Sequence, residues 1–477
     1  MNKLLALLCS LLTASAYAQS IDRYFESIRN NTAELTAFFS QMPKGGDLHN
    51  HYSGSVYAET YISYVVQQDY VINEGTLEVK SAPPKEGKGW VRFSKLNDSG
   101  LLAGYKQKLI QKWSVKDYNG VSYPSDKQFF ETFSGFGIAN DGPGRLDTGL
   151  MELKRRALNE NVSYIETMFT SIHCDNIKVV DTSFNRPLED AQRNRDETQT
   201  RTLLDKLYKT VQDKNIKACA AEYNNNVVSK LHYGLKIDDS SFTMRYQNYV
   251  IRVVPPADVF KNLVLAFESA NTCSLIVGVN IVAPEDNEVS MRDYWLHMQM
   301  FKYCHEKYPD VKYSMHAGEL ALGMVKPEEL TWHINAAVRT AGANRIGHGA
   351  DMAYEHNCYD LLEYMAAHKI PIEINLFSNE FILKVKDDQH PITLYKDFHV
   401  PIVICSDDAG VLRSNLTYQF VLLAKRYKDI SYNDIKQYVF NSIDFSFIKE
   451  DAVKEKLKKQ LTGRFNSFER KVMTTNK

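Results

Sequence analysis

Two histidines separated by one residue are the first side chains in this sequence that could do chemistry together. His49 and His51 end a short segment, GGDLHNH, that we expect to form a strand. Because side chains alternate across a strand, both imidazoles would face the same side, where two ring nitrogens can reach one metal ion. Two polar residues can also simply occupy one face of a sheet, so the pair by itself leaves both interpretations open.

Three further polar motifs follow apolar segments later in the chain. They are HAGE, which runs from His316 to Glu319, then His348 between two glycines, and the adjacent Asp407 and Asp408. Each has a simpler alternative, since His348 could lie in a turn, the aspartates could cap a helix and Glu319 could be a surface carboxylate. Three imidazoles and a carboxylate, all nitrogen and oxygen donors, nevertheless suit a catalytic zinc ion that keeps one position for water.

The elements that would bring these motifs together alternate between buried strands and helices. Besides the strand ending in His51, apolar character predicts strands at residues 162–168, 246–253, 274–282, 311–316, 345–348, 370–376 and 400–406. Strands that are apolar on both faces and separated by helices indicate a parallel sheet covered by helices. Eight such units favour a (β/α)8 barrel of the TIM type over an open doubly wound sheet, whose glycine-rich fingerprint is absent. The carboxyl ends of barrel strands meet at one mouth, so the polar motifs would converge there.

Segments outside this alternation are expected to surround the barrel. Apolar spacing in residues 19–41 predicts an N-terminal helical extension, and residues 126–136 should also be helical. An insertion at about residues 68–125 follows the first strand, and within it residues 81–99, with their Pro-Pro and glycines, predict irregular structure. From Asn415 onward, lysines and glutamates spread as on a solvated face indicate closing helices.

The first residues have the pattern of a secretory signal. Lys3 precedes an apolar run at residues 4–12, and the small residues that follow end in Ala-Tyr-Ala before Gln19. The run is too short to span a membrane. A buried helix fits the small-residue ending less well, and Cys9 lacks the small preceding residue of a lipoprotein site. We therefore expect residues 1–18 to be removed and the mature chain to be exported, to a periplasm or beyond.

The composition limits the partners of the chain. Its 477 residues are 44% hydrophobic and carry a formal net charge of -1, which leaves no electrostatic footprint for nucleic acid or an anionic membrane. Six of the seven cysteines lie beyond residue 18 and form no CxxC pair, so a thiolate metal site is not indicated, although one disulfide could form in an oxidising compartment. Small uncharged partners are favoured.

Taken together, the motifs resemble the metal-dependent adenosine deaminases of the amidohydrolase superfamily. The matching stretches are MPKGGDLHNHYSGS, SMHAGE, RIGHG, EINLFSN, SDD and NSIDFSF, which extend from Met42 to about Phe447. The resemblance implies that residues 42–477 form a deaminase barrel. The helix before the barrel, the MPKGG spelling, the signal and the insertion are similar to the secreted, growth-factor type of that family.

The resemblance also implies a role for each polar motif. It implies one zinc ion per chain, bound by His49, His51, His316 and Asp407. Glu319 would protonate the ring nitrogen beside the attacked carbon and then shuttle protons to the leaving ammonia. His348 would orient the attacking hydroxide from outside the ligand set, and Asp408 would hydrogen-bond the purine.

The substrate pocket departs from the family pattern at one strand. The resemblance implies that Phe129 and Phe133 belong to an apolar lid, although an aromatic stripe at helical spacing can equally be core packing. After the fourth strand, Ala283 replaces a glycine whose backbone N–H receives the purine, and Glu285 matches the acid beside it. The added methyl group of Ala283 leaves the purine less room to approach the backbone, so the identity of the aminopurine substrate stays open.

The leading hypothesis is zinc-dependent hydrolytic deamination of adenosine or 2'-deoxyadenosine to the inosine form with release of ammonia. One alternative keeps this chemistry and changes the substrate to another 6-aminopurine or a modified adenosine. Another is a non-catalytic extracellular signalling or binding module. The expected partner is a small purine nucleoside, with neither nucleic acid nor membrane after signal cleavage. A homodimer is an option that the sequence leaves open.

Overall fold

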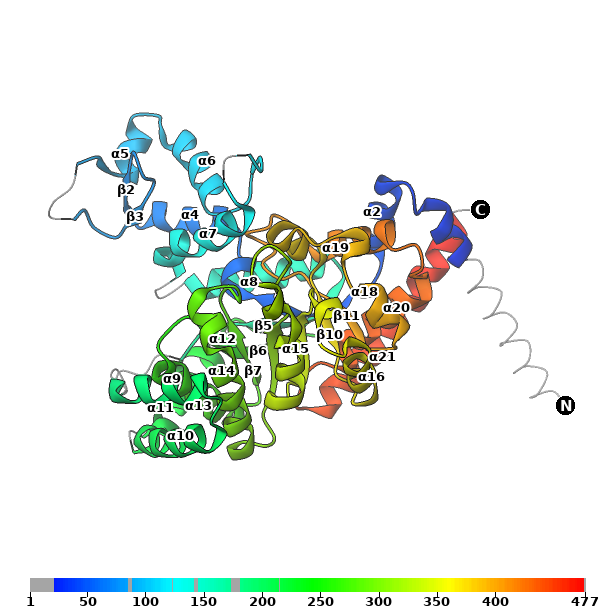
Figure 1. Cartoon of the computed structure of the whole chain (residues 1–477). Coiled ribbons are helices and arrows are strands. Elements are labelled where there is room, and N and C mark those ends of the chain that lie inside the picture. Colours follow the sequence, from blue (N-terminus) through cyan, green and yellow to red (C-terminus); the bar gives the residue numbers. More distant parts are fainter. Residues whose placement is uncertain are drawn as a thin grey trace.

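The structure is a computed structural model that describes residues 21–84, 88–121, 123–140, 145–172, 181–213 and 215–475 (Figure 1). The predicted signal at residues 1–18 lies outside the described residues. No helix among the described residues combines the length and apolar character needed to cross a membrane.

Eight parallel strands form the centre of the molecule. In sheet order they are β1 (Gly45–His51), β5 (Val162–Met168), β6 (Thr243–Ile251), β7 (Ile276–Val282), β8 (Lys312–Ala317), β9 (Arg345–His348), β10 (Ile372–Ile374) and β11 (Ile402–Ile404). A parallel bridge between Asn50 and Asp407 joins the first strand to the chain just after the last, where the Asp407 N–H donates to the His49 carbonyl at 2.9 Å. The predicted (β/α)8 barrel is confirmed.

The strands lie in the sheet in the same order as along the chain, and each crossover between parallel neighbours contains helices. The helices from the barrel mouth to the end of the chain are α3 (Tyr52–Ser55), α4 (Ala58–Gln67), α7 (Ser125–Asn140), α8 (Arg145–Asn159), α9 (Asn185–Arg193), α10 (Glu197–Gln212), α11 (Ile216–Tyr223), α12 (Lys230–Gly234), α13 (Pro256–Thr272), α14 (Glu288–Lys307), α15 (His333–Asn335), α16 (Cys358–Ala367), α17 (Leu376–Ser378), α18 (Ile392–Asp397), α19 (Leu416–Arg426), α20 (Tyr432–Asp444) and α21 (Asp451–Thr475). Segments of 3-10 or π helix are η2 (Thr182–Phe184), η3 (Asn224–Ser229), η4 (Pro327–Thr331), η5 (Ala336–Ala341), η6 (Met352–Tyr354), η7 (Asn379–Leu383) and η8 (Asp387–Gln389).

The segment before the barrel is helical and lies against the end of the chain. Residues 21–28 and α2 (Thr32–Gln41) form helices, and the side chain of Asn31 caps α2 by accepting from two of its first N–H groups. The ring of Phe38 meets that of Phe468 on α21 at 5.0 Å between centroids. This aromatic packing places α2 beside α19, α20 and α21 (Figure 1).

The insertion contains more regular structure than its composition predicts. Three short antiparallel strands, β2 (Val71–Asn73), β3 (Val79–Lys80) and β4 (Trp90–Arg92), are followed by α5 (Phe93–Asp98) and α6 (Leu102–Lys112). The prediction of irregular structure at residues 81–99 is therefore wrong for β4 and α5. β4 is held by its pairing with β2, which lies outside residues 81–99. The segment projects from the barrel, opposite the chain end marked C (Figure 1).

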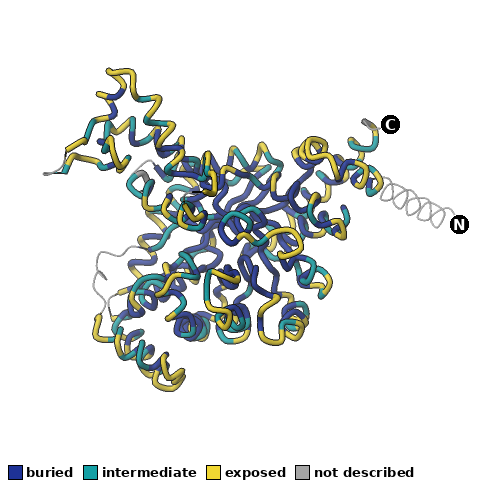
Figure 2. Tube along the Cα trace, turned by 45° about the horizontal axis from the view of Figure 1, so that its top comes forward, coloured by how far each residue is buried: buried dark blue, intermediate teal, exposed yellow. Residues whose placement is uncertain are grey.

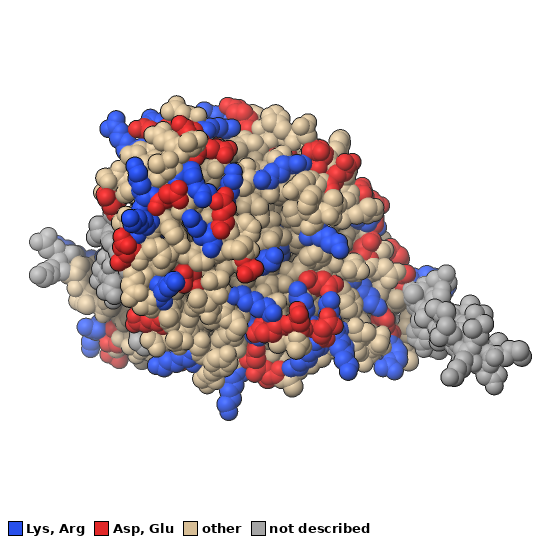
Figure 3. All heavy atoms as spheres, turned by 90° about the horizontal axis from the view of Figure 1, so that it is seen from below, with Lys and Arg blue, Asp and Glu red and all other residues tan. Residues whose placement is uncertain are grey.

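Burial divides the molecule into a covered barrel and a mostly exposed insertion (Figure 2). The strands are almost entirely buried, because helices cover the outside of the barrel and side chains fill its inside. On the face seen in Figure 3, acidic and basic side chains are interspersed, in keeping with a formal net charge of -1.

Candidate active site

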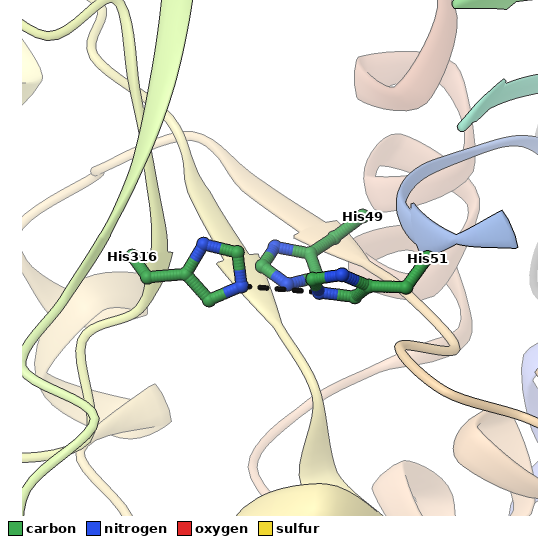
Figure 4. Close-up of side chains that lie close together, drawn as sticks. All are labelled: His49, His51 and His316. Carbon is green, nitrogen blue, oxygen red and sulfur yellow. Dashed lines mark hydrogen bonds between the residues drawn. The ribbon is translucent and has the colours of Figure 1, made fainter. Parts of the chain in front are cut away.

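The predicted metal-binding side chains meet at the carboxyl ends of the strands. His49 and His51 come from β1, His316 from β8 and Asp407 from the turn after β11, and the three imidazole rings point toward one another (Figure 4). Nε2 of His51 lies 3.1 Å from Nε2 of His316 and 3.4 Å from Oδ1 of Asp407, while Nε2 of His49 lies 3.7 Å from the same oxygen. The alternation that predicted one shared face for His49 and His51 thus brings both rings to one point.

Hydrogen bonds on the far side of two imidazoles fix which nitrogen faces the centre. Nδ1 of His49 donates to Oε2 of Glu373 at 2.8 Å, and Nδ1 of His316 donates to Oδ1 of Asn280 at 2.9 Å. Each ring therefore presents the lone pair of Nε2 inward, the arrangement that orients metal-binding histidines. Glu373 is itself held by Nε of Arg345 at 2.5 Å.

The donors fit a metal ion in type, and His51, His316 and Asp407 also fit it in protonation state. For His49, burial acts to lower the pKa, but the hydrogen bond to Glu373 and the charge of Asp407 raise it. Nε2 of His49 is buried and has no hydrogen-bond partner, although polar groups rarely remain unpaired inside a protein. Burial lowers the pKa of His51 to about 4 and that of His316 well below its ordinary value, so both rings are neutral. Burial acts to raise the pKa of Asp407, but the surrounding imidazoles lower it to about 2. Neutral imidazoles and an ionised carboxylate are the forms that bind zinc.

Two further side chains border this cluster. Nε2 of His348 lies 3.6 Å from Oε1 of Glu319 and 4.0 Å from Oδ2 of Asp407. Burial, together with the charge of Asp407, raises the pKa of Glu319 well above its ordinary value, which favours the protonated form of its carboxyl group. A protonated carboxyl group beside a metal-type cluster can act as a general acid.

Asp408 lies beside the cluster, within 4.8 Å of His51 and Asp407, and has one unpaired oxygen. Its Oδ1 is buried without a hydrogen-bond partner, and burial together with the neighbouring Asp407 raises its pKa well above its ordinary value. A Cβ atom added to Gly54 would lie 1.6 Å from this oxygen, so the glycine of the first motif leaves the room that Asp408 occupies.

A cavity of about 440 Å³ opens over these groups. The lining residues are His51, Ser53, Phe129, Phe130, Phe133, Tyr249, Ile251, Val282, Ala283, Pro284, His316, Glu319, His348, Asp407 and Asp408. Its floor is therefore polar and its walls are aromatic and aliphatic, as in pockets that bind small ligands. Phe129 and Phe133 lie on α7, the helix expected near residues 126–136, and Ala283 is at the end of β7.

Glu285, by contrast, does not line the cavity. Its carboxylate accepts from the backbone N–H groups of Gly318 and Glu319, at 3.2 and 2.9 Å, and from Nδ1 of His333 at 2.6 Å. The structure thus differs from the purine contact that the resemblance implied, since both oxygens support the backbone that carries Glu319.

The backbone is strained at three of these positions. Ala283, His348 and Asp407 have φ angles of 86°, 68° and 59°, in the region that normally favours glycine. Such strain costs on the order of 1–3 kcal/mol per residue and clusters at functional sites. Ala283 therefore keeps the glycine-like backbone of the residue that it replaces.

Several residues of the site escaped prediction. Phe130, Tyr249 and Ser53 line the cavity, while Asn280 and Glu373 orient the ligands. The last two did leave a signal in the sequence, because each is a polar residue inside an otherwise apolar strand. No spacing rule marks the cavity residues, which converge from separate elements.

A parallel barrel with three imidazoles and a carboxylate at the carboxyl ends of its strands is an arrangement typical of metal-dependent hydrolases. A family model described as adenosine deaminase matches residues 224–463. The chain belongs to the adenosine deaminase family.

The chain is similar to an adenosine deaminase from Clostridium kluyveri, with 27% identity over 242 residues, which are 50% of this chain and 63% of that relative. Among solved structures, the N6-methyl-AMP deaminase of Arabidopsis thaliana matches with a TM-score of 0.55 at 19% identity, covering 90% of this chain and 98% of that one. A zinc-bound amidohydrolase from Burkhoderia ambifaria matches with a TM-score of 0.55 at 15% identity, over 92% and 94%. At these identities the structural matches support the fold.

Proposed function

We propose that this protein is a zinc-dependent deaminase that hydrolyses adenosine or 2'-deoxyadenosine to inosine or 2'-deoxyinosine and ammonia. The observation that carries the proposal is the position of the buried Glu319 carboxyl group, whose pKa is raised, beside the His49, His51, His316 and Asp407 cluster at the floor of the cavity. Membership of the adenosine deaminase family supports the same chemistry.

His49, His51, His316 and Asp407 would hold the ion, one per chain. When bound, the zinc ion would lower the pKa of a water molecule toward neutrality and so supply hydroxide at working pH. The unpartnered Nε2 of His49 would gain a partner, and Asp407 would offset part of the charge of the ion.

The remaining polar side chains would handle the substrate and the protons. Glu319 would donate its proton to the ring nitrogen beside the carbon that is attacked. As that carbon gains an oxygen, Glu319 would take up the proton lost by the water and pass it to the amino group, which leaves as ammonia. His348 would hydrogen-bond the attacking oxygen, and the free oxygen of Asp408 would bind the five-membered ring of the purine.

The cavity favours an unphosphorylated nucleoside. None of the described residues that line it is a lysine or arginine. A 5'-phosphate would bring up to about two negative charges into the cavity with no cationic side chain to pair with.

We therefore expect kcat/KM for AMP to be at least about a hundredfold below that for adenosine, a difference of roughly 2.7 kcal/mol. Ile251 lines the cavity and is 37% exposed. Ile251→Arg should therefore reduce the difference in kcat/KM between adenosine and AMP by supplying a cation, while the uncharged Ile251→Gln should not. Steady-state rates of ammonia release for both substrates measure this. Equal turnover of AMP by the wild type would contradict the nucleoside assignment.

Two alternatives make different predictions. Another 6-aminopurine, or an adenosine modified on its amino group, would use the same residues and would be found by the same rate measurements on a panel of aminopurines. A signalling or binding module would act without turnover. The buried carboxyl group of Glu319, whose pKa is raised, favours the enzyme, because binding alone does not require a proton donor at this position.

We also propose that the chain is exported, with residues 1–18 as the signal. Cys219 is disulfide-bonded, which supports an oxidising compartment. N-terminal sequencing of the protein recovered from the periplasm or medium of its host should give a chain that starts near Gln19; recovery of the uncleaved chain in the cytosol would refute export.

A further inference from the structure

Three buried side chains form a line of hydrogen bonds that ends at His348. The backbone N–H of Ile392 donates to Nδ1 of His390 at 3.2 Å. Nε2 of His390 lies 3.1 Å from Oδ1 of Asn379, and Nδ2 of Asn379 lies 3.0 Å from Nδ1 of His348. None of the three side-chain residues is more than 1% exposed, so water does not compete for these groups.

The direction of every bond in this line follows from its first donor. A backbone N–H can only donate, so Nδ1 of His390 accepts and the neutral ring carries its proton on Nε2. Burial and nearby Arg426 lower the pKa of His390 to about 3, which keeps the ring neutral. Nε2–H of His390 then donates to the carbonyl oxygen of Asn379, and this leaves the amide NH2 group of Asn379 facing His348.

The last hydrogen bond, between Asn379 and His348, determines the tautomer of His348. Its Nδ1 accepts from the Asn379 amide, because a proton on Nδ1 would set two N–H groups against each other. The ring proton is therefore on Nε2, which faces the carboxylate oxygens of Glu319 and Asp407 at 3.6 and 4.0 Å. His49 and His316 have the opposite tautomer, since their Nδ1 atoms face the acceptors Glu373 and Asn280.

We propose that Asn379 and His390 are positioning residues that lock His348 in the Nε2–H tautomer. In this form His348 presents a donor to the attacking oxygen and has no inward lone pair with which to bind the metal. The catalytic part of this inference rests on the deaminase function proposed above. The tautomer itself does not.

The sharpest test is Asn379→Asp, which replaces an amide donor by a carboxylate acceptor of the same shape. His348 should then carry its proton on Nδ1 and turn a lone pair toward the metal cluster. Nitrogen-15 NMR of histidine-labelled, metal-free protein distinguishes the tautomers, and the His348 signals are assigned by their loss in His348→Asn. We expect Nε2–H in the wild type, Nδ1–H in Asn379→Asp, and a cobalt-loaded variant whose visible spectrum shows an added nitrogen ligand.

Turnover should change with the tautomer. In Asn379→Asp, kcat should fall at least about a hundredfold with metal content retained, because a histidine in the wrong tautomer cannot donate. A matched control is Asn224→Asp, which removes a buried amide donor that bonds Ser269 and Thr272, none of which lines the cavity. It should leave the His348 tautomer and kcat unchanged even if it lowers the melting temperature.

A second pair of variants, at His390, tests the inference in case Asn379→Asp does not fold. His390→Phe removes the donor to Asn379 and should lower kcat about tenfold or more, whereas His390→Gln can keep an N–H near the same place and should restore most of it. Nδ1–H on His348 in the wild type, or an unchanged tautomer and kcat in both Asn379→Asp and His390→Phe, would overturn the inference. A wild type that deaminates no aminopurine would refute the proposed function, and the NMR result would still decide the tautomer.

Discussion

Glu319→Gln is expected to lower kcat for adenosine by about 10²–10⁴-fold, the usual contribution of a general acid. Glutamine keeps the shape of the side chain but has no proton to give to the ring nitrogen and cannot shuttle one to the amino group. Because the proton is needed in the transition state, kcat and kcat/KM should fall together while KM changes little. Initial rates of ammonia release across a range of adenosine concentrations measure both constants.

The control for this variant is Glu355→Gln. Glu355 is also buried, and burial raises its pKa to about 7, but it accepts from backbone N–H groups of Ile334 and Asn335 and does not line the cavity. Its replacement should leave kcat near the wild-type value. Zinc content should equal that of the wild type in both variants. If Glu319→Gln turns over adenosine as fast as the wild type, Glu319 is not the general acid.

Removing the metal is expected to abolish turnover and to lower the melting temperature. An ion that binds only the folded chain, at a free concentration a hundredfold above its Kd, stabilises the fold by about 2.7 kcal/mol. For a chain of 477 residues, whose unfolding entropy is about 1 kcal/mol/K, that corresponds to roughly 3 °C. Thermal unfolding of chelator-treated protein, before and after zinc is restored, measures the shift, and identical curves would contradict a bound metal.

His316→Asn tests whether the shift arises at this cluster. The asparagine amide can still donate to Asn280, as Nδ1 of His316 does, but the inward nitrogen is lost. The zinc-dependent shift and the turnover should therefore both disappear. His333→Asn is the matched control, because His333 is equally buried and its Nδ1 bonds Glu285 outside the cluster, so the zinc-dependent shift should persist. Glu373→Gln, which loosens only the support of His49, should weaken metal affinity about 10–100-fold.

The sequence predicts most of the barrel because strand signals are local. Residues 162–168 and 345–348 coincide with β5 and β9, since apolar side chains on both faces mark a strand buried by helices. The segment at residues 370–376 is longer than β10, because the chain turns into α17 after Asn375. The short strands of the insertion were missed, because they are held by pairing with a distant strand and not by their own composition.

By itself, the sequence determined the barrel, from eight apolar strand segments separated by helices, and the polar residues at the ends of those strands. Alternation along one strand determined the common face of His49 and His51. Only the tertiary structure decided how these groups are oriented. Nδ1 of His49 bonds Glu373, 324 residues away, and this contact turns Nε2 toward the proposed metal. The tertiary structure also places the Glu285 carboxylate against the backbone N–H of Glu319 and joins His348 to Asn379 by a hydrogen bond. Barrel closure selects such partners, because it brings strand ends together from the whole chain, and no local pattern encodes that choice.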